Sequence, residues 1–168
     1  MFEHFNTPEE IFSFKLGSAH AMEKKLLEVL EELEQTAHRD EIKQALREHR
    51  EETRQHAMNI EQCFALLDED IDDSPCPVIE AMAKEGKATI KKTDDALVDV
   101  IVLVAATESE HYEIAVYEAL ITNAHARGAS EVAALLQQNL DQEKHALEVA
   151  RTTMRTIAEQ GIAVTTTV

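Results

Sequence analysis

Glycine, proline and aromatic residues are scarce in this chain. Its 168 residues include four glycines, three prolines and no tryptophan, and aromatic side chains make up 4% of the total. So little turn-forming material allows few connections, while the abundant Ala, Leu, Glu, Lys and Gln favour long helices. We therefore predict an all-α protein with a mostly aliphatic core, folded as a single domain over residues 1–168.

Cysteines and long apolar runs are also few. We interpret the two cysteines, Cys63 and Cys76, as reduced thiols, because a chain of this length needs no disulfide scaffold. The opening MFEHFNTPEE is acidic and lacks the basic and apolar regions of a secretory signal. The longest apolar run, residues 96–106, is short and contains Asp99, which argues against a transmembrane helix. The sequence thus predicts a cytoplasmic protein.

Basic residues are outnumbered two to one. Lys and Arg total 16 against 33 Asp and Glu, for a formal net charge of −17. Such a charge repels phosphate backbones and anionic membranes, so we predict neither a nucleic-acid partner nor a membrane partner. It attracts metal cations and basic partners, although an ordinary solvated surface would account for most of it.

Helix start and stop signals divide the chain into five helices. Thr7 is the expected N-cap of the first, with Glu10 completing a capping box. Asp40 is expected to cap the second, and Gly128 to end the fourth. The predicted helices are about 8–35, 40–67, 77–92, 94–127 and 130–160. The tail 161–168 is expected to be disordered.

The lengths and joints of these helices indicate how they pack. Four have roughly 30 residues, or about 45 Å. Two pairs are joined by very short connections, which forces antiparallel hairpins. The 77–92 helix belongs to the long connection between the hairpins. This predicts a ferritin-like up-down four-helix bundle with a long crossover carrying a fifth, shorter helix. A plain elongated bundle without a crossover is the alternative.

Polar residues interrupt the apolar face of every long helix. In the first helix, for example, Phe12, Leu16 and Leu26 share a face with a glutamate. The interrupting residues are Glu23 of the first helix, His49, Glu52 and His56 of the second, Glu110 and Glu113 of the fourth, and Glu143 of the fifth.

The interrupting glutamates lie at matching heights. Glu23 and Glu52 are equally far from the first expected joint, near residue 37, and Glu113 and Glu143 are equally far from the second, at Gly128. About 15 residues separate each from its turn, or roughly 22 Å at the helical rise. The sequence therefore predicts four carboxylates meeting near the middle of the bundle.

A dry core cannot hold four ionised carboxylates unaided, because each costs several kcal/mol to desolvate. Protonation with a raised pKa is one solution, and divalent cations are the other. A carboxylate-rich site with one or two imidazoles suits iron or manganese and tolerates zinc. This is the layout of dimetal carboxylate bundles, so we predict two divalent metal ions, with iron preferred.

The sequence resembles the ferritin-like YciE/YciF family of bacterial proteins from residue 7 to about 157. The resemblance implies a five-helix ferritin-like fold, a homodimer, a dimetal centre and stress-associated expression. The segments that carry it are AMEKKLLEVL, LREHREETRQHAMNIEQCFALL, CPVIEAMAKEG, ESEHYEIAVYEAL and QNLDQEKHALE.

By position, the resemblance also implies a set of metal ligands. Glu110 would be an extra ligand or an acceptor behind the ligands. The implied ligands are Glu23, Glu52, His56, Glu113 and Glu143. No catalytic residue separate from the ligands is predicted. Tyr112 and Tyr117 are expected to pack in the core, although either hydroxyl could hydrogen-bond to a ligand carboxylate.

Two departures from the family pattern affect these predictions. The usual spacing is Glu-x-x-His, whereas Glu52 and His56 are four residues apart; they still share a helix face, and a π-bulge could adjust the register. His49, three residues before Glu52, is therefore a rival ligand. Leu147 stands where the pattern suggests an acidic residue, which leaves the second metal position poorer in ligands or dependent on Glu110.

The leading functional hypothesis is a dimetal carboxylate protein with ferroxidase or peroxide-related redox activity in a stress response. Its partners would be metal ions and O2 or peroxide. One alternative is an iron-binding or storage module without turnover. Another is a metal-free helical interaction protein whose polar core specifies pairing.

Overall fold

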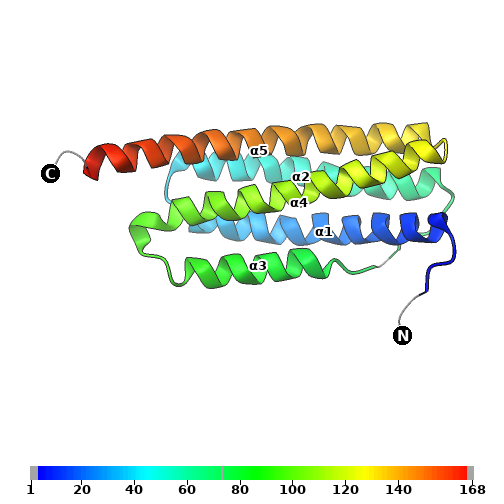
Figure 1. The fold of residues 1–168 in the computed structure, drawn as a ribbon, viewed down its shortest axis with the longest axis horizontal. Coiled ribbons are helices and arrows are strands. Elements are labelled where there is room, and N and C mark those ends of the chain that lie inside the picture. The colour runs from blue at the N-terminus through cyan, green and yellow to red at the C-terminus, as the bar shows by residue number, and fades with distance from the viewer. Residues whose placement is uncertain (1–3, 73, 166–168) are drawn as a thin grey trace.

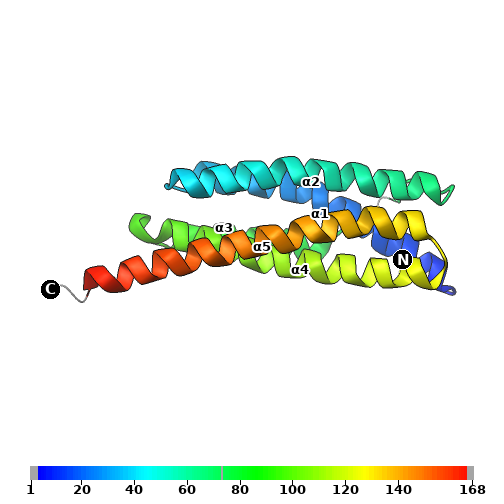
Figure 2. The same ribbon diagram turned by 90° about the horizontal axis from the view of Figure 1, so that it is seen from above.

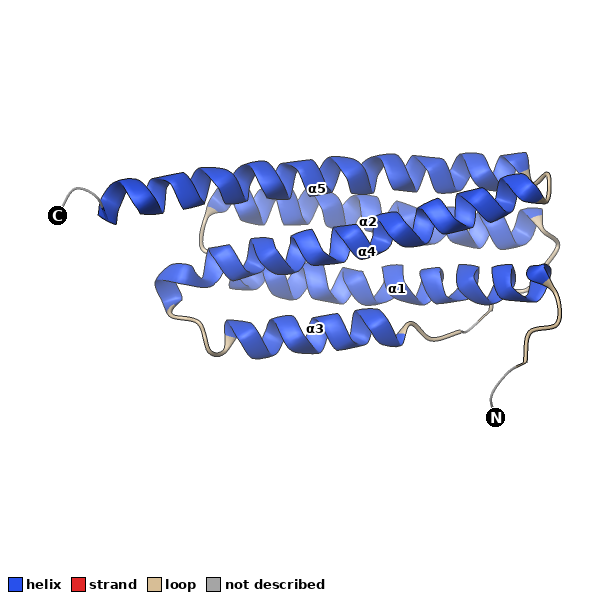
Figure 3. Ribbon diagram, viewed as in Figure 1, coloured by secondary structure: helices blue, strands red, loops and turns tan. Residues whose placement is uncertain are grey.

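A computed structural model describes residues 4–72 and 74–165 of the protein, and these residues form helices without any strand (Figure 3). The long helices follow the predicted ranges closely. The elements are α1 (Pro8–Thr36), α2 (Asp40–Leu66), α3 (Pro77–Ile90), the 3-10 turn η1 (Asp95–Leu97), α4 (Val98–Ala126) and α5 (Ser130–Thr165) (Figure 1).

The helices form two antiparallel hairpins, α1–α2 and α4–α5, which lie against each other as two layers (Figure 2). The connection between the hairpins carries α3, which packs along α1 and α4 and returns the chain over much of the bundle length (Figure 1). As a result α2 and α4 run in the same direction. The predicted ferritin-like bundle with a crossover is confirmed, and the plain bundle is ruled out.

Local signals account for two of the helix ends. Thr7 Oγ1 accepts from the Glu10 backbone N–H at 3.2 Å, and Glu10 Oε2 accepts from the Thr7 backbone N–H at 3.4 Å, which completes the predicted capping box. Gly128, just after α4, has a φ of +75°, a conformation that favours glycine over other residues.

The prediction that Asp40 caps α2 is wrong. Asp40 is the first residue of the helix, and the N-cap residue Arg39 makes no side-chain capping bond within the described part of the chain. Instead Asp99 of α4 accepts from the backbone N–H of His38 at 2.7 Å and from that of Arg39 at 3.3 Å. The carboxylate inside the longest apolar run therefore caps a neighbouring helix.

The far end of α5 also differs from the prediction. The helix continues to Thr165, five residues past the predicted end at 160, so residues 161–165 of the expected disordered tail are helical, while 166–168 lie outside the described residues. Ile157 packs against the apolar core, and Arg39 Nη1 donates to Gln160 Oε1 at 3.1 Å. These contacts hold the last turns of α5 beside the N-terminal end of α2.

The linker after α2 crosses α1 at Gly17. A Cβ atom at this position would lie 2.7 Å from both the backbone oxygen and Oδ1 of Asp72. Such a distance is well inside van der Waals contact, so only glycine allows the linker to pass here.

The apolar core falls into two clusters along the bundle. One includes Phe12, Leu16, Phe64 and Leu136, and the other includes Leu30 and Val102 among its members. On α2, α4 and α5, buried polar residues occupy the positions between the clusters. Among the described residues, none of the helices has the length and apolar character needed to cross a membrane.

Candidate metal centre

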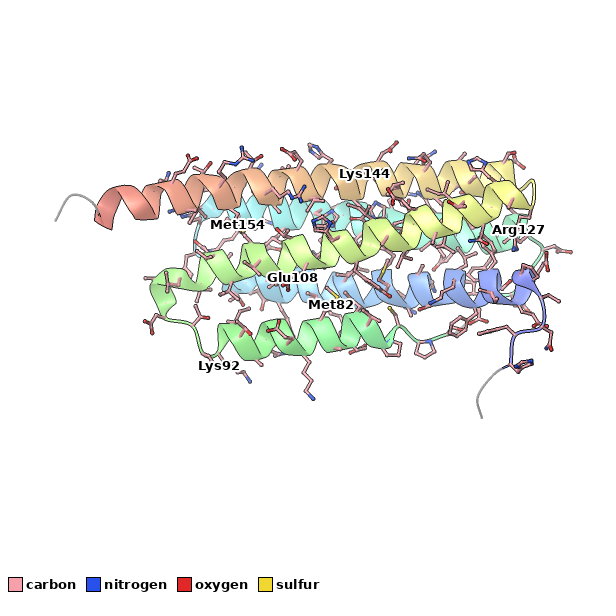
Figure 4. The ribbon with its side chains drawn as sticks, in the orientation of Figure 1. Met82, Lys92, Glu108, Arg127, Lys144 and Met154 are labelled. Atoms are coloured by element: carbon pink, nitrogen blue, oxygen red, sulfur yellow. The ribbon has the colours of Figure 1, made fainter. Side chains whose placement is uncertain are left out.

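Six buried ionisable residues meet between the two apolar clusters, and we call them the polar layer. Each of the four long helices contributes at least one of them. They are Glu23 of α1, His49 and His56 of α2, Glu110 and Glu113 of α4, and Glu143 of α5, with exposed fractions of 0 to 7%. The next residue after Glu143, Lys144, lies on the outer side of α5 (Figure 4), where its Nζ is 3.2 Å from the exposed Glu118.

Two groups of ligand-type atoms form within the polar layer, each with its members within 4.8 Å of one another. In the first, His56 Nδ1 lies 2.8 Å from Glu143 Oε1 and 3.6 Å from Glu23 Oε2. In the second, His49 Nε2 lies 3.2 Å from Glu110 Oε1 and 3.4 Å from Glu143 Oε2. Glu143 therefore belongs to both groups and presents a different oxygen to each.

Both histidines have an acceptor on their outer nitrogen. His56 Nε2 lies 2.8 Å from Gln142 Oε1, and His49 Nδ1 lies 3.2 Å from Glu52 Oε2. An amide or carboxylate oxygen only accepts hydrogen bonds, so the outer nitrogen of each ring carries a proton. The inner nitrogen is then free either to hold a second proton or to offer its lone pair to a cation. Metal-binding histidines are oriented by this type of contact.

The layer contains more acceptors than its own residues can satisfy. Both oxygens of Glu113 and of Glu143, and one oxygen each of Glu23 and Glu110, are buried without a hydrogen-bond partner among the described residues. His56 Nδ1 is also without one, because its close contact with Glu143 is not aligned as a hydrogen bond. Buried polar atoms are rarely left unpaired in folded proteins. The excess of oxygen acceptors fits cations.

The charge balance points the same way. Four carboxylates and two neutral imidazoles carry a formal charge of −4, and protonation of both rings reduces it only to −2. Two divalent cations would neutralise the first state. Four carboxylates with two imidazoles form a donor set that suits iron or manganese.

Without a cation, the layer retains protons. Burial, together with Glu143, Glu110 and Glu23, raises the pKa of Glu113 well above its usual value. Burial likewise raises the pKa of Glu143 to about 8, against the opposing effect of His56. For His56, burial favours the neutral ring, but Glu143 and Glu23 outweigh it and raise its pKa to about 10. Cations and protons therefore compete for the same atoms.

Glu52, predicted to lie in the core, lies at its edge. Its side chain is 32% exposed, and it contacts the outer nitrogen of His49 instead of joining either group of converging atoms. At about 100° per residue, His49 and His56 face within about 20° of each other, whereas Glu52 is offset by about 40–60°. Both histidines therefore enter the layer, and α2 stays α-helical with no π-bulge between Asp40 and Leu66.

The other predicted positions are placed as follows. Glu110, left open between ligand and acceptor, lies in the second group. Glu108, two residues earlier on α4 (Figure 4), is exposed. Leu147 is buried and apolar, so it offers no ligand atom. The second group consists instead of His49, Glu110 and Glu143. The assignment of these residues as ligands stays a prediction.

The comparisons with known proteins cover most of the chain. A family model described as a domain of unknown function (DUF892) matches residues 7–164. The chain belongs to the DUF892 family. Protein YciF of Escherichia coli K12 is 31% identical to it over 143 residues, which are 84% of this chain and 86% of YciF. The resemblance to the YciE/YciF family is confirmed.

Solved structures agree with this family assignment. The crystal structure of the E. coli stress protein YciF matches this DUF892 protein with a TM-score of 0.87 and 26% identity, covering 92% of this chain and 99% of that one. YcfI from Rhodopseudomonas palustris matches with a TM-score of 0.87 and 27% identity, covering 90% and 98%. A protein from Xanthomonas campestris pv. campestris, at 24% identity and a TM-score of 0.74, shares the fold.

A chain of hydrogen bonds in this DUF892 protein leads from the surface to Glu23. Gln55 Nε2 donates to Asn59 Oδ1 at 2.8 Å, and Asn59 Nδ2 donates to Asn139 Oδ1 at 2.7 Å. Asn139 Nδ2 donates to the Tyr117 hydroxyl at 3.0 Å, and that hydroxyl donates to Glu23 Oε1. Every donor points towards Glu23, so the bonds polarise one another in the same sense. These bonds fix Oε1 of Glu23 and leave Oε2 of the same carboxylate facing His56.

Most of this series of hydrogen bonds was not predicted from the sequence. Tyr117 was expected to pack in the core, and it is fully buried as well as hydrogen-bonded to a carboxylate, whereas Tyr112 contacts Cys76 Sγ at 3.3 Å. A signal was available for Asn139, because it precedes Glu143 by four residues and so shares its helix face. Asn59 similarly lies one turn from His56.

Proposed function

We propose that this DUF892 protein binds two divalent metal ions, iron or manganese, in the polar layer and uses them for ferroxidase or peroxide-related redox chemistry in a stress response. The observation that carries the proposal is the arrangement of the two histidines. Each has its outer nitrogen on an acceptor and its inner nitrogen within 3.4 Å of a Glu143 oxygen that has no hydrogen-bond partner among the described residues.

The two groups of atoms suggest how the ligands divide. Glu23 and His56 would hold one ion, His49 and Glu110 the other, and Glu143 would bridge them, with Glu113 adjacent. When bound, the ions would supply Lewis acidity and, for iron or manganese, a redox couple that can react with O2 or peroxide.

The surrounding residues have separate tasks. Glu52 orients His49, Gln142 orients His56, and the Tyr117 hydroxyl fixes one oxygen of Glu23. The two apolar clusters on either side surround the layer with low-dielectric material, which strengthens its electrostatic contacts. In the metal-free protein the inner nitrogen of His56 holds a proton that an ion would displace.

The remaining parts of the proposal rest on indirect support. The description of the E. coli relative as a stress protein supports a stress-related role. The resemblance to the family supports a homodimer, and the net charge of −17 supports metal ions over nucleic acids as partners. A cytoplasmic location rests on the interpretation of Cys63 and Cys76 as reduced thiols.

A metal titration tests the proposal. Protein stripped with a chelator is titrated anaerobically with Fe(II) or Mn(II), and bound metal is counted by elemental analysis. We expect two ions per chain, with most of the binding lost in Glu143→Ala and retained in the exposed control Glu108→Ala. Mixing the iron-loaded protein with O2 or peroxide should consume the oxidant. If the wild type takes up neither metal, the proposal is wrong.

One observation also favours the metal-free alternative. A protonated His56 lying 2.8 Å from Glu143 would balance part of the charge without any ion. In that case Glu113→Gln should raise the melting temperature equally with and without added metal at a pH high enough to ionise Glu113, because there it only relieves repulsion. Metal binding predicts instead that the variant loses metal-dependent stabilisation. Storage without turnover would require a large cage, which size-exclusion chromatography distinguishes from a dimer.

A further inference from the structure

A small pocket between α2, α4 and α5 reaches the polar layer. Its volume is about 110 Å3, and two residues of the layer, His49 and Glu110, line its buried end. The half-exposed Glu52 and the exposed Glu48 and His145 line its outer end. The pocket therefore connects solvent with the second group of converging atoms.

The inner end of the pocket offers an unused ligand atom. Glu110 is 2% exposed, and its Oε2 has no hydrogen-bond partner within the described ranges 4–72 and 74–165. The walls are small and aliphatic, with Ala45, Ala106 and Ala146 among them. An ion that enters thus passes from the outer carboxylates, Glu48 and Glu52, to Glu110, without any basic side chain of lysine or arginine along the lining.

Size limits what can use this route. Pockets that hold organic ligands usually enclose about 300–1,000 Å3, several times the volume found here. A groove between α1, α3 and α4 is larger, at about 320 Å3, but its lining, taken from the described residues, includes no member of the polar layer. We therefore do not regard that groove as a route to the polar layer.

We propose that the α2–α4–α5 pocket is the entrance by which divalent cations reach the polar layer, with Glu48 and Glu52 as the carboxylates at its mouth and Glu52 the nearer to the layer. This inference rests on the proposed metal binding and adds its route. Glu52 then has two tasks, because the same carboxylate that attracts the ion also accepts from the outer nitrogen of His49.

Blocking the pocket tests the entrance. Ala146, half-buried in its wall on α5, is replaced by phenylalanine, and the matched control is Ala83→Phe in the larger groove. Co(II) is mixed with metal-free protein in a stopped-flow instrument, and the absorbance of the bound ion gives the rate and the final stoichiometry. We expect Ala146→Phe to slow uptake by about tenfold or more with the same endpoint, because entry then requires the helices to open. Ala83→Phe should bind at the wild-type rate.

A second variant keeps the test decisive if the phenylalanine disturbs folding. Ala146→Cys is folded first and then labelled with a bulky disulfide-forming reagent, while the native Cys63 and Cys76 are protected by burial. Labelling should slow Co(II) uptake, and reduction should restore it. In Glu52→Gln, which keeps an acceptor for His49 but loses the charge, uptake should slow most at low salt.

The outcomes separate the two proposals. If the wild type binds no Co(II), metal binding itself fails. If it binds Co(II) and both blocked forms of the pocket take it up at the wild-type rate, the entrance is refuted while metal binding stands.

Discussion

The most demanding test of the polar layer is the substitution Glu143→Gln, which keeps the shape of the side chain and removes its charge. Burial raises the pKa of Glu143 from 4.5 to about 8. A carboxyl group whose pKa is raised by folding contributes its stability below pH 4.5 and loses it as the pH rises through 8. The metal-free wild type should therefore become less stable between about pH 5 and 9.

The loss of stability that the ionisation of Glu143 causes has an upper limit. At 1.36 kcal/mol per pKa unit, a rise from 4.5 to about 8 corresponds to roughly 5 kcal/mol. His56, with its pKa raised to about 10, acts in the same direction, but it shares its contact with Glu143 and is not counted again. For a domain of this size, 1 kcal/mol shifts the melting temperature by about 2–4 °C, so the part of the decline that Glu143 causes should not exceed roughly 10–20 °C.

Bound metal should reverse this trend. A ligand present at 100 times its dissociation constant stabilises a protein by about 2.7 kcal/mol, or roughly 5–11 °C here. Because cations compete with protons for Glu143 and His56, the stabilisation should grow as the pH rises. In Glu143→Gln, the pH-dependent decline should be smaller and the metal effect largely absent.

Scanning calorimetry at pH 6, 7.5 and 9, with Mn(II) or with chelator, measures both effects. The control is Glu118→Gln on α4, which alters an exposed carboxylate paired with Lys144 at 3.2 Å. If Glu143→Gln retains the wild-type pH dependence and the wild-type response to Mn(II), the bridging position that we assign to Glu143 is refuted.

Other predictions follow from single contacts. Tyr117→Phe, which removes the hydroxyl that fixes Glu23, should weaken Mn(II) binding about 10–100-fold by calorimetry; an unchanged affinity would exclude this role. Gly17→Ala should lower the free energy of unfolding by about 1–3 kcal/mol in urea, because the added Cβ would meet Asp72; equal stability would show that the linker moves aside freely. Asp99→Ala should cost about 1 kcal/mol through the loss of the cap on α2, with no change in metal binding.

Much of the fold could be predicted from local signals. The Thr7 capping box and the glycine after α4 act within a few residues, so they are visible in the sequence. The cap on α2 was mispredicted because its acceptor, Asp99, lies about 60 residues away on another helix. The extension of α5 was missed for a similar reason, since contacts with Arg39 and the core hold its last turns.

The candidate site could be predicted in part. Glu23, Glu113 and Glu143 interrupt apolar faces, and the structure brings all three into the polar layer. Glu52 was misplaced because an amphipathic helix has an apolar face about 100° wide, so an offset of 40–60° is compatible with either the core or its edge. His49 was left open because the spacing of Glu52 and His56 did not fit the Glu-x-x-His pattern, and Glu110 was left open between ligand and acceptor.

The pairing of long helices as hairpins and the acidic residues at mid-bundle follow from local features, because helix length, capping and periodicity are properties of consecutive residues. The contacts between particular oxygens and nitrogens depend on how the helices pack: Glu143 lies between His49 and His56, and Glu52 lies behind His49. The rotation of a helix about its own axis is set by packing against its neighbours, and no pattern within one helix specifies it.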